Sequence, residues 1–271
     1  MSISVLTIVK GRAGALNNLI KGLAANTIFP DELVVVFMNE PERNLPDAPF
    51  IIKQFSFSHC EDLPLAAARN FAAKNAVGDR LIFLDVDCIP SSFLVETYLK
   101  NFESEFLVNG EVRYLQNGFD KHTDWFSELE ASSEPDPIRF EMAILPHELF
   151  WSLNFGCFAA DYWKIGGFDE RFAGYGAEDT DFAFTAREQT IGMKLIAAVA
   201  YHQYHEQYKP PLNHFDDIAR NAKVFFQKWK KWPMEGWLRS FVDLGLITWD
   251  NDELHILRKP NQKEILNARK V

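Results

Sequence analysis

Apolar runs and helix-like segments alternate over the first hundred positions of the chain. Segments with strand character, many of them rich in β-branched residues, are 3–9, 32–38, 80–84 and, more weakly, 51–55. Between them, residues 14–25 and 63–75 have helical character. Strands that are apolar along their whole length are covered on both faces, and strands separated by helices form parallel sheets. The pattern therefore predicts a doubly wound α/β fold with a mostly parallel central sheet.

The second half of the chain is less regular. A predicted helix over 91–101 leads into an excursion over 116–147 that mixes Gly, Ser, Pro and acidic residues. Order returns with a short strand from Asn154, and a glycine-rich turn over 165–176 then precedes a helix from about Asp179. An apolar run that ends at Ala200 indicates one more strand.

Domain organisation follows from this change in pattern. We predict one domain over 1–214, with a first half at 1–101 and a second at 102–214. Residues 215–271 form a helical extension that packs against it. The extension holds four of the seven Trp residues, which favours packing over a second catalytic unit.

Composition narrows the class of protein. Acidic residues outnumber basic ones by 38 to 28, a net charge of −10, so nucleic acid is not an expected partner. Cys60, Cys88 and Cys157 lack CxxC spacing, which argues against a disulfide framework and favours a cytoplasmic protein. The segment WKKWP at 229–233 suggests peripheral contact with the inner face of a membrane, although a helix end packed on the core is the favoured interpretation.

Ligands of such sheets bind beyond the carboxyl ends of the strands. Polar residues follow three predicted strands, at 10–12, at 39–40 and at 85–87. Residues two apart in an extended segment point the same way, so Asp85 and Asp87 could share one ligand. Carboxylates at a buried strand end suit Mg²⁺ or Mn²⁺ holding a diphosphate, although a bare D-x-D also occurs in solvated turns.

A second acidic cluster opens the helix after the glycine-rich turn. Glu178, Asp179 and Asp181 stand together there. Acids at a helix N-terminus cap the helix and favour its dipole. A carboxylate that reaches the site would instead abstract a proton as a general base. The residues alone leave both interpretations open.

Other side chains are weaker candidates. His202 and His205 could reach a metal from a strand end, although a lone histidine is more often packed or on the surface. Lys10, Arg12 and Arg69 could bind a phosphorylated ligand, with ordinary surface charge as the alternative. The aromatic candidates for stacking on a sugar or a base are Trp125, Trp163 and Tyr175, for which core packing is the commoner role.

Three segments occur together in order: AAARNFAAKNAVGDRLIFLDVDCIP, GGFDERFAGYGAEDTDFAF and AYHQYH. With them, the chain from Val5 to about Phe215 resembles the GT-A glycosyltransferases. The closest likeness is to family 2-like enzymes whose C-terminal half is similar to that of β-1,4-galactosyltransferases and bacterial chondroitin polymerases. The resemblance implies a GT-A fold for nucleotide-diphospho-sugar transfer.

The resemblance also implies a metal site. Asp87 would coordinate Mn²⁺ or Mg²⁺, while Asp85 would contact the ribose or help to hold the metal. His202 matches the histidine ligand of the family, and His205 is the reserve candidate.

Further roles concern the acceptor and the donor. Asp179 resembles the general base that deprotonates the acceptor hydroxyl, Glu178 would position the acceptor, and Tyr175 stands where relatives have an aromatic platform. The nucleotide and its diphosphate would be lined by Lys10, Gly11, Arg12 and Arg69. Many relatives have an Asp pair after the second strand, but this chain has Asn39 and Glu40, which would read the base and the ribose.

The implied activity is metal-dependent, inverting transfer of a hexose or N-acetylhexosamine, with galactose or GalNAc favoured. The donor would be a UDP-sugar and the acceptor a surface polysaccharide or lipid-linked glycan. One alternative is a sugar-1-phosphate nucleotidyltransferase, but the segment GRAGALNN only faintly matches the loop of those enzymes. The other is an inactive protein that binds a glycan or a nucleotide sugar.

Overall fold

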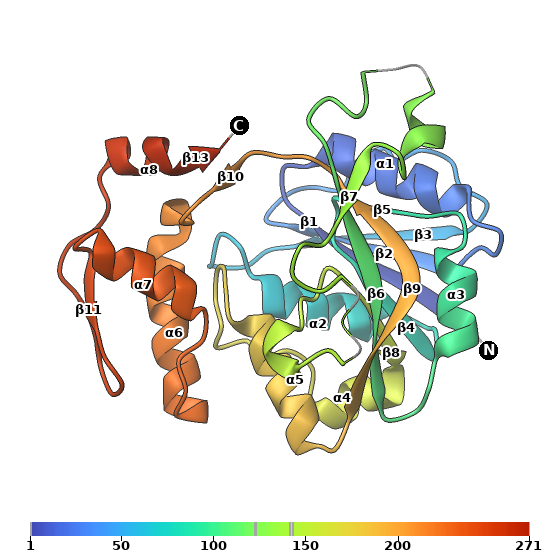
Figure 1. Ribbon diagram of the computed structural model, residues 1–271. Helices are drawn as coiled ribbons and strands as arrows, with labels where there is room; N and C mark the ends of the chain where they lie inside the picture. Colours follow the sequence, from blue (N-terminus) through green and yellow to red (C-terminus); the bar gives the residue numbers. More distant parts are fainter. Residues whose placement is uncertain (1, 122–123, 141, 143, 271) are drawn as a thin grey trace.

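The computed structural model describes residues 2–121, 124–140, 142 and 144–270 (Figure 1). Its centre is a nine-stranded sheet with the order β3-β2-β1-β4-β8-β6-β9-β5, in which β7 also pairs with β6. The strands are β1 (Ile3–Val9), β2 (Glu32–Met38), β3 (Ile51–Phe57), β4 (Arg80–Leu84), β5 (Cys88–Pro90), β6 (Phe106–Leu115), β7 (Ser133–Pro135), β8 (Asn154–Phe158) and β9 (Gly192–His202).

Strand direction confirms the mostly parallel sheet. The pairs β1–β2, β2–β3, β1–β4 and β6–β9 are parallel. Strand β8 lies antiparallel between β4 and β6, so the sheet keeps one main direction on both sides of it. Across β4 and β8, Phe83 is paired with Phe155, and their rings stack with centroids 4.5 Å apart.

Alternate residues of the inner strands feed two separate cores. From β2, Leu33 and Val35 enter the core that α1 (Ala13–Ala24) and α3 (Leu94–Asn101) cover. Their neighbours Val34 and Val36 enter the core under α2 (Leu65–Asn75), α4 (Ala159–Ile165) and α5 (Glu178–Glu188). This period of two explains why the strands are apolar throughout, as helices cover both faces.

The predicted boundaries are close to the observed ones. The strands predicted at 3–9, 32–38 and 80–84 have the predicted ends, and β3 continues two residues further, to Phe57. Helix α2 starts at Leu65 rather than at 63, because the residue before Pro64 is disfavoured in helical conformation. The excursion contains the short elements η1 (Trp125–Glu128) and β7, and η2 (His147–Leu149) begins at its last residue.

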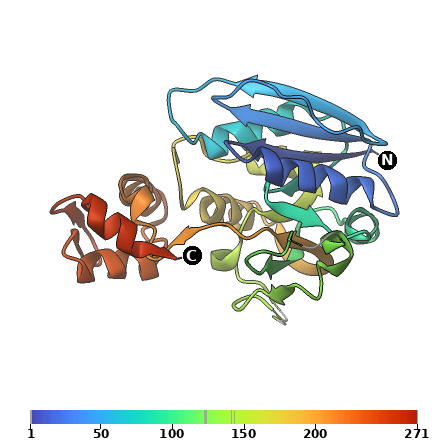
Figure 2. The same cartoon turned by 90° about the horizontal axis from the view of Figure 1, so that it is seen from above.

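Residues 212–270, the C-terminal lobe, lie beside the sheet with a core of their own (Figures 1 and 2). The prediction of helices is correct but incomplete, because the lobe also contains a two-stranded hairpin. The elements of the lobe and of the segment leading to it are β10 (Gln207–Tyr208), η3 (Leu212–His214), α6 (Phe215–Trp229), α7 (Glu235–Asp243), β11 (Ile247–Trp249), β12 (Leu254–Ile256), α8 (Gln262–Ala268) and β13 (Arg269–Lys270), which pairs with β10.

A buried carboxylate joins the lobe to the main sheet unit. Asp181 on α5 is 1% exposed and accepts hydrogen bonds from Lys228 Nζ at 2.9 Å and from Trp229 Nε1 at 2.7 Å. Trp229 also packs edge to face on Phe184. The third acid of the cluster at 178–181 is therefore a structural contact between α5 and α6.

The same contacts place the WKKWP segment. Trp232 stacks on Phe226 with centroids 4.2 Å apart, so both tryptophans of the segment are packed within the protein. Only Lys230 and Lys231 of the segment are exposed. These contacts favour the interpretation of the WKKWP segment as a helix end packed on the core, rather than as a membrane contact. Among the described helices, none combines the length and the apolar character needed to cross a bilayer.

Candidate active site

A cleft of about 740 Å³ opens at the carboxyl ends of the parallel strands. Residues at or just beyond the ends of β1, β4, β6 and β9 line it, as do the start of α5 and residues 234–237 of the lobe. Its charged side chains are three basic and six acidic ones: Lys10, Arg12, Arg69, Asp85, Asp87, Glu148, Glu178, Asp179 and Glu235. An acidic cleft binds a diphosphate only if a cation offsets this charge.

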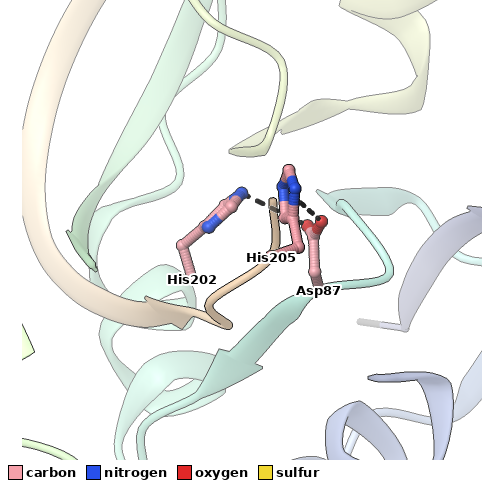
Figure 3. A group of neighbouring side chains, drawn as sticks. All are labelled: Asp87, His202 and His205. Atoms are coloured by element: carbon pink, nitrogen blue, oxygen red, sulfur yellow. Dashed lines mark ion pairs between the residues drawn. The ribbon is translucent and has the colours of Figure 1, made fainter. Parts of the chain in front are cut away.

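One carboxylate and two imidazoles converge at one end of the cleft (Figure 3). The Nε2 atoms of His202 and His205 each lie 3.6 Å from an oxygen of Asp87. Asp87 follows β4 and His202 ends β9, and Cys88 of β5 is paired with His202, so the sheet itself fixes their proximity.

This group fits a divalent cation. Its ligand atoms all lie within 4.8 Å of one another. The 3.6 Å separations are shorter than the roughly 4.2 Å that separates opposite ligands of a Mg²⁺-sized ion. Carboxylate and imidazole suit Mn²⁺, and three protein ligands leave positions open for an anion.

A hydrogen bond to the backbone of Glu206 sets the tautomer of His205. Its Nδ1 lies 2.9 Å from the carbonyl oxygen of Glu206, which can only accept a hydrogen bond, so Nδ1 carries the proton and Nε2 carries the lone pair. Burial and the Arg12 guanidinium lower the pKa of His205. A neutral imidazole with Nε2 facing Asp87 is the form that binds a metal.

The cations predicted for the diphosphate lie at the end of β1. Both Lys10 and Arg12 line the cleft. Arg12 is in contact with the carboxylate of Asp87, and Lys10 with that of Asp62. The candidate cations thus lie next to the candidate metal group, as a diphosphate site requires.

Asp85 and Asp87 do not lie on an extended segment. The chain turns between them, with Cys88 N donating to Asp85 O at 2.9 Å. Asp85 faces Arg69 Nη2 at 3.4 Å, on the other side of the turn from the histidines. The expectation of parallel carboxylates on an extended segment was wrong because this segment is a turn. The group around Asp87 does not include Asp85.

Arg69 is a buried link between the two acidic clusters. It is 5% exposed, and its Nη1 lies 3.1 Å from Glu178 Oε1. Burial alone would lower the pKa of Arg69, but the negative charges of Asp85, Glu178 and Asp179 outweigh it and raise that pKa. Since carboxylates hold both ends of the guanidinium, Arg69 organises the acids as well as lining the cleft.

Asp179 is a partly buried carboxylate with a raised pKa. Burial and the neighbouring charge of Glu178 raise its pKa to about 7, against the opposing effects of Arg69 and the Thr180 N–H. A base with a pKa near the working pH is half ionised and still basic enough to take a proton. Its place at the start of α5 also brings it into the cleft.

The turn before α5 depends on glycine and on the lobe. Gly174 has a φ of +74°, and a Cβ there would lie 2.2 Å from Asp217 Cγ on α6. Asn221, on the same helix, donates to the carbonyls of Ala173 and Gly176 at 3.0 and 2.9 Å. Helix α6 therefore holds the backbone that carries Glu178 and Asp179.

Asn39 and Glu40 are held by hydrogen bonds to the loops around them. Asn39 donates to Glu61 O at 2.8 Å and accepts from His59 N at 2.7 Å. Glu40 accepts from Gly11 N at 2.8 Å and pairs with Arg43 at 2.7 Å. These bonds join loops beside the strand ends, and the structure does not bring Gly11, Asn39 or Glu40 into the cleft lining.

Of the three aromatic candidates, only Tyr175 belongs to the cleft lining. Tyr175 lines the cleft, and burial raises its pKa. Trp125 packs on Phe119 and under Lys21, and Trp163 lies on α4 against Tyr162. Neither of these two tryptophans is part of the cleft lining.

Several residues that line the cleft were not predicted from the sequence. Trp151 and Tyr114 face the cleft from the β8 and β6 side, and Trp237 faces it from the lobe. Tyr114 lies 5.2 Å from the ring of His202, centroid to centroid. A tyrosine in a strand pattern and a tryptophan on an amphipathic helix look like core residues, so no local signal marks them.

Comparisons with known proteins show what the chain is similar to. The family model "Glycosyl transferase family 2" matches residues 4–175, and the model "N-terminal domain of galactosyltransferase" matches 142–209. Validoxylamine A glucosyltransferase of Streptomyces hygroscopicus is 35% identical over 71 residues, which are 26% of this chain and 17% of that enzyme. The match thus spans about a sixth of that relative.

Solved structures share the fold. TarS 1-349 of S. aureus with UDP-GlcNAc has a TM-score of 0.57 at 16% identity, over 83% of this chain and 67% of that one. Mannosyltransferase PcManGT of Pyrobaculum calidifontis, with GDP-Man and Mn²⁺, has a TM-score of 0.54 at 15% identity, over 90% of this chain and 70% of that one. The predicted GT-A fold is confirmed, and the nucleotidyltransferase alternative loses its support. The first family model covers more than half of the chain, which therefore belongs to glycosyl transferase family 2.

Proposed function

We propose that this protein transfers a sugar from a nucleotide-sugar donor to a hydroxyl of a glycan, with a divalent cation and with inversion of the anomeric carbon. The observation that carries the proposal is that Asp87 and His202, which form a group with His205, line the same cleft as Asp179 with its raised pKa. The first set suits a leaving diphosphate and the second an acceptor proton.

The donor would lie between the end of β1 and the histidines. Asp87, His202 and His205 would hold Mn²⁺ or Mg²⁺, which stabilises the departing diphosphate as a Lewis acid. Lys10 and Arg12 would bind the phosphates from the other side. The TarS and PcManGT structures contain UDP-GlcNAc and GDP-Man, which supports a nucleotide sugar for this cleft.

The nucleobase would occupy an apolar part of the cleft, lined by Ile8, Met38, Leu63 and Leu65. These side chains suit a flat ring, whereas Asn39 and Glu40 are engaged in the neighbouring loops. A UDP-sugar remains the favoured donor, with galactose or GalNAc as the transferred group.

The reaction would be one displacement. The acceptor oxygen forms a bond to the anomeric carbon as the bond from that carbon to the diphosphate oxygen breaks. Asp179 takes the proton of the acceptor hydroxyl, and Glu178, held by Arg69, positions the acceptor sugar. The bonding electrons leave with the diphosphate, so no covalent nucleophile on the protein is needed.

We further propose that residues 1–214 form the catalytic unit and 215–271 the extension, in line with the separate core of the lobe. A cytoplasmic location would keep Cys60, Cys88 and Cys157, which are free thiols, in reduced form.

Calorimetric titration tests this proposal. UDP, GDP, UDP-GlcNAc, UDP-GalNAc, UDP-galactose, UDP-glucose and GDP-mannose would be titrated with and without Mn²⁺, into the wild type and Asp87→Ala. We expect Mn²⁺-dependent binding of one nucleotide sugar, lost in the variant. If no nucleotide binds at any metal concentration, the catalytic proposal fails and the inactive glycan-binding alternative takes its place.

A further inference from the structure

The lobe contributes one wall of the cleft. Met234, Glu235, Gly236 and Trp237 line it together with Tyr175 and Asp179. These four residues belong to the turn before α7 and to its first residues. The wall lies beside Tyr175, which precedes the candidate base Asp179 by four residues.

From this arrangement we propose that Trp237 is the stacking platform for an uncharged pyranoside acceptor, so that the lobe determines which acceptor is used. The proposal deepens the sugar transfer proposed above and rests on it. It names a residue outside both matched family regions, which end at residues 175 and 209.

Two aromatic rings, Tyr175 and His214, hold the platform in place. Tyr175 stacks on His214 with centroids 4.5 Å apart and planes at 22°. Trp237 stacks on Tyr175 with centroids 5.9 Å apart and planes at 25°. The Tyr175 backbone N–H donates to Asp217 Oδ2 at 3.3 Å, which fixes this series of rings to α6. A rigid indole at a cleft wall binds the C–H face of a pyranose at small entropic cost.

Negative charge around this wall favours an uncharged acceptor sugar. Glu235 is exposed beside Trp237, and Asp179 and Glu178 stand across the cleft. Arg69, the cation paired with Glu178, is buried and is also held by Asp85. A uronic acid or a sugar phosphate would place a second negative charge next to these carboxylates, which is unfavourable in a partly desolvated site. A neutral sugar avoids this cost.

The test compares neutral with anionic probes and two tryptophan variants. Methyl α- and β-glucoside, galactoside and N-acetylglucosaminide would be set against methyl glucuronide and galacturonide. Saturation-transfer NMR with UDP and Mg²⁺ reports binding of each probe to the wild type, Trp237→Ala, Trp237→Phe and Trp232→Ala. Trp232 is the matched control because it stacks on Phe226 in the same lobe.

We expect saturation of the ring protons of at least one neutral glycoside and none of the uronides. The signal should be lost in Trp237→Ala and kept in Trp237→Phe and Trp232→Ala. With the donor in hand, the acceptor KM of Trp237→Ala should rise roughly tenfold more than its donor KM.

Binding that is equal in Trp237→Ala and the wild type, or stronger for the uronides, overturns the inference. So does an equal loss in Trp232→Ala, because that would be damage to the lobe. The NMR experiment also runs without nucleotide. Lack of nucleotide binding in the calorimetric titration contradicts the sugar transfer, whereas lack of glycoside binding contradicts the platform, so the two failures are distinguishable.

Discussion

Arg69 and Glu178 form a buried ion pair, with Nη1 3.1 Å from Oε1 and both side chains 7% exposed. The pair joins α2 to the first residue of α5. Asp85 lies on the other arm of the guanidinium, 3.4 Å from Nη2, so one cation serves both acidic clusters of the cleft.

Removal of this cation should destabilise the protein strongly. Arg69→Met takes the paired cation away from Asp85 and Glu178, and loss of one member of a buried pair costs about 3–5 kcal/mol of the free energy of unfolding. Urea unfolding measures the change. The control is Arg171→Met, since Arg171 is 66% exposed in its pair with Asp169, and such pairs contribute less than about 1 kcal/mol. Equal effects of the two substitutions would contradict a special role for Arg69.

The rate of transfer should depend on the ionisation of Asp179. Its pKa of about 7 means that the base is protonated in acid, so kcat/KM should rise about tenfold per pH unit below pH 7 and level off above it. Asp179→Asn should lower kcat by a factor of roughly 10² to 10⁴. A flat profile between pH 5 and 8 in the wild type would exclude Asp179 as the base.

The same substitution should not weaken the fold. A folded pKa above the value of a free Asp means that the native state binds the proton more tightly, so native stability falls as pH rises from about 4 to 7. Asparagine removes this penalty. The melting temperature of Asp179→Asn should therefore match or exceed that of the wild type at pH 8, with a smaller gain at pH 5. A marked drop at pH 8 would show that the carboxylate stabilises the fold instead.

Both histidines of the metal group should affect binding of the ion. His202→Ala and His205→Ala should each weaken Mn²⁺ binding, measured by electron paramagnetic resonance with UDP present, by at least about tenfold. His255→Ala is the control, because that histidine is 66% exposed and pairs with Glu253 on the lobe surface. If His205→Ala binds Mn²⁺ like the wild type, then Asp87 and His202 hold the ion without it.

The Asp181 contact should hold the lobe to α5. Asp181→Ala removes the acceptor of two hydrogen bonds and leaves Lys228 only its longer contacts to Asp169 and Thr185, a loss of about 1–3 kcal/mol. The double variant with Lys228→Met should lose less than the sum of the single variants. Thermal unfolding of the four proteins gives this coupling energy. Simple additivity would mean that the pair makes no net contribution.

The local sequence pattern was sufficient to predict the strands and the polar residues that follow their ends. The apolar runs of β1, β2 and β4 have their predicted ends because burial on both faces keeps their inner positions apolar, with Ser4 and Thr7 of β1 as the exceptions. Parallel strands then bring their carboxyl ends to one edge, so Lys10, Asp87 and His202 could be placed in one site.

Contacts between segments far apart in the chain could not be predicted from the sequence. The antiparallel insertion of β8 depends on pairing with both β4 and β6, which no local pattern specifies. The turn at Val86 and the hydrogen bonds of Asn39 with residues 59 and 61 are likewise set by neighbours. Trp237 reaches the cleft only through packing of the lobe, so its place could not be predicted.

The separate hydrophobic core of the lobe has a consequence for divergence of such proteins. A wall built largely on a core of its own can accumulate substitutions, or be exchanged between relatives, while the sheet keeps its carboxyl-end edge intact. The contacts that such an exchange must preserve are the shared aromatic cluster of Phe172, Phe184 and Phe225 and the hydrogen bonds of Asp181 and Asn221. Chimeras that respect these positions offer a route to new pairings of donor and acceptor.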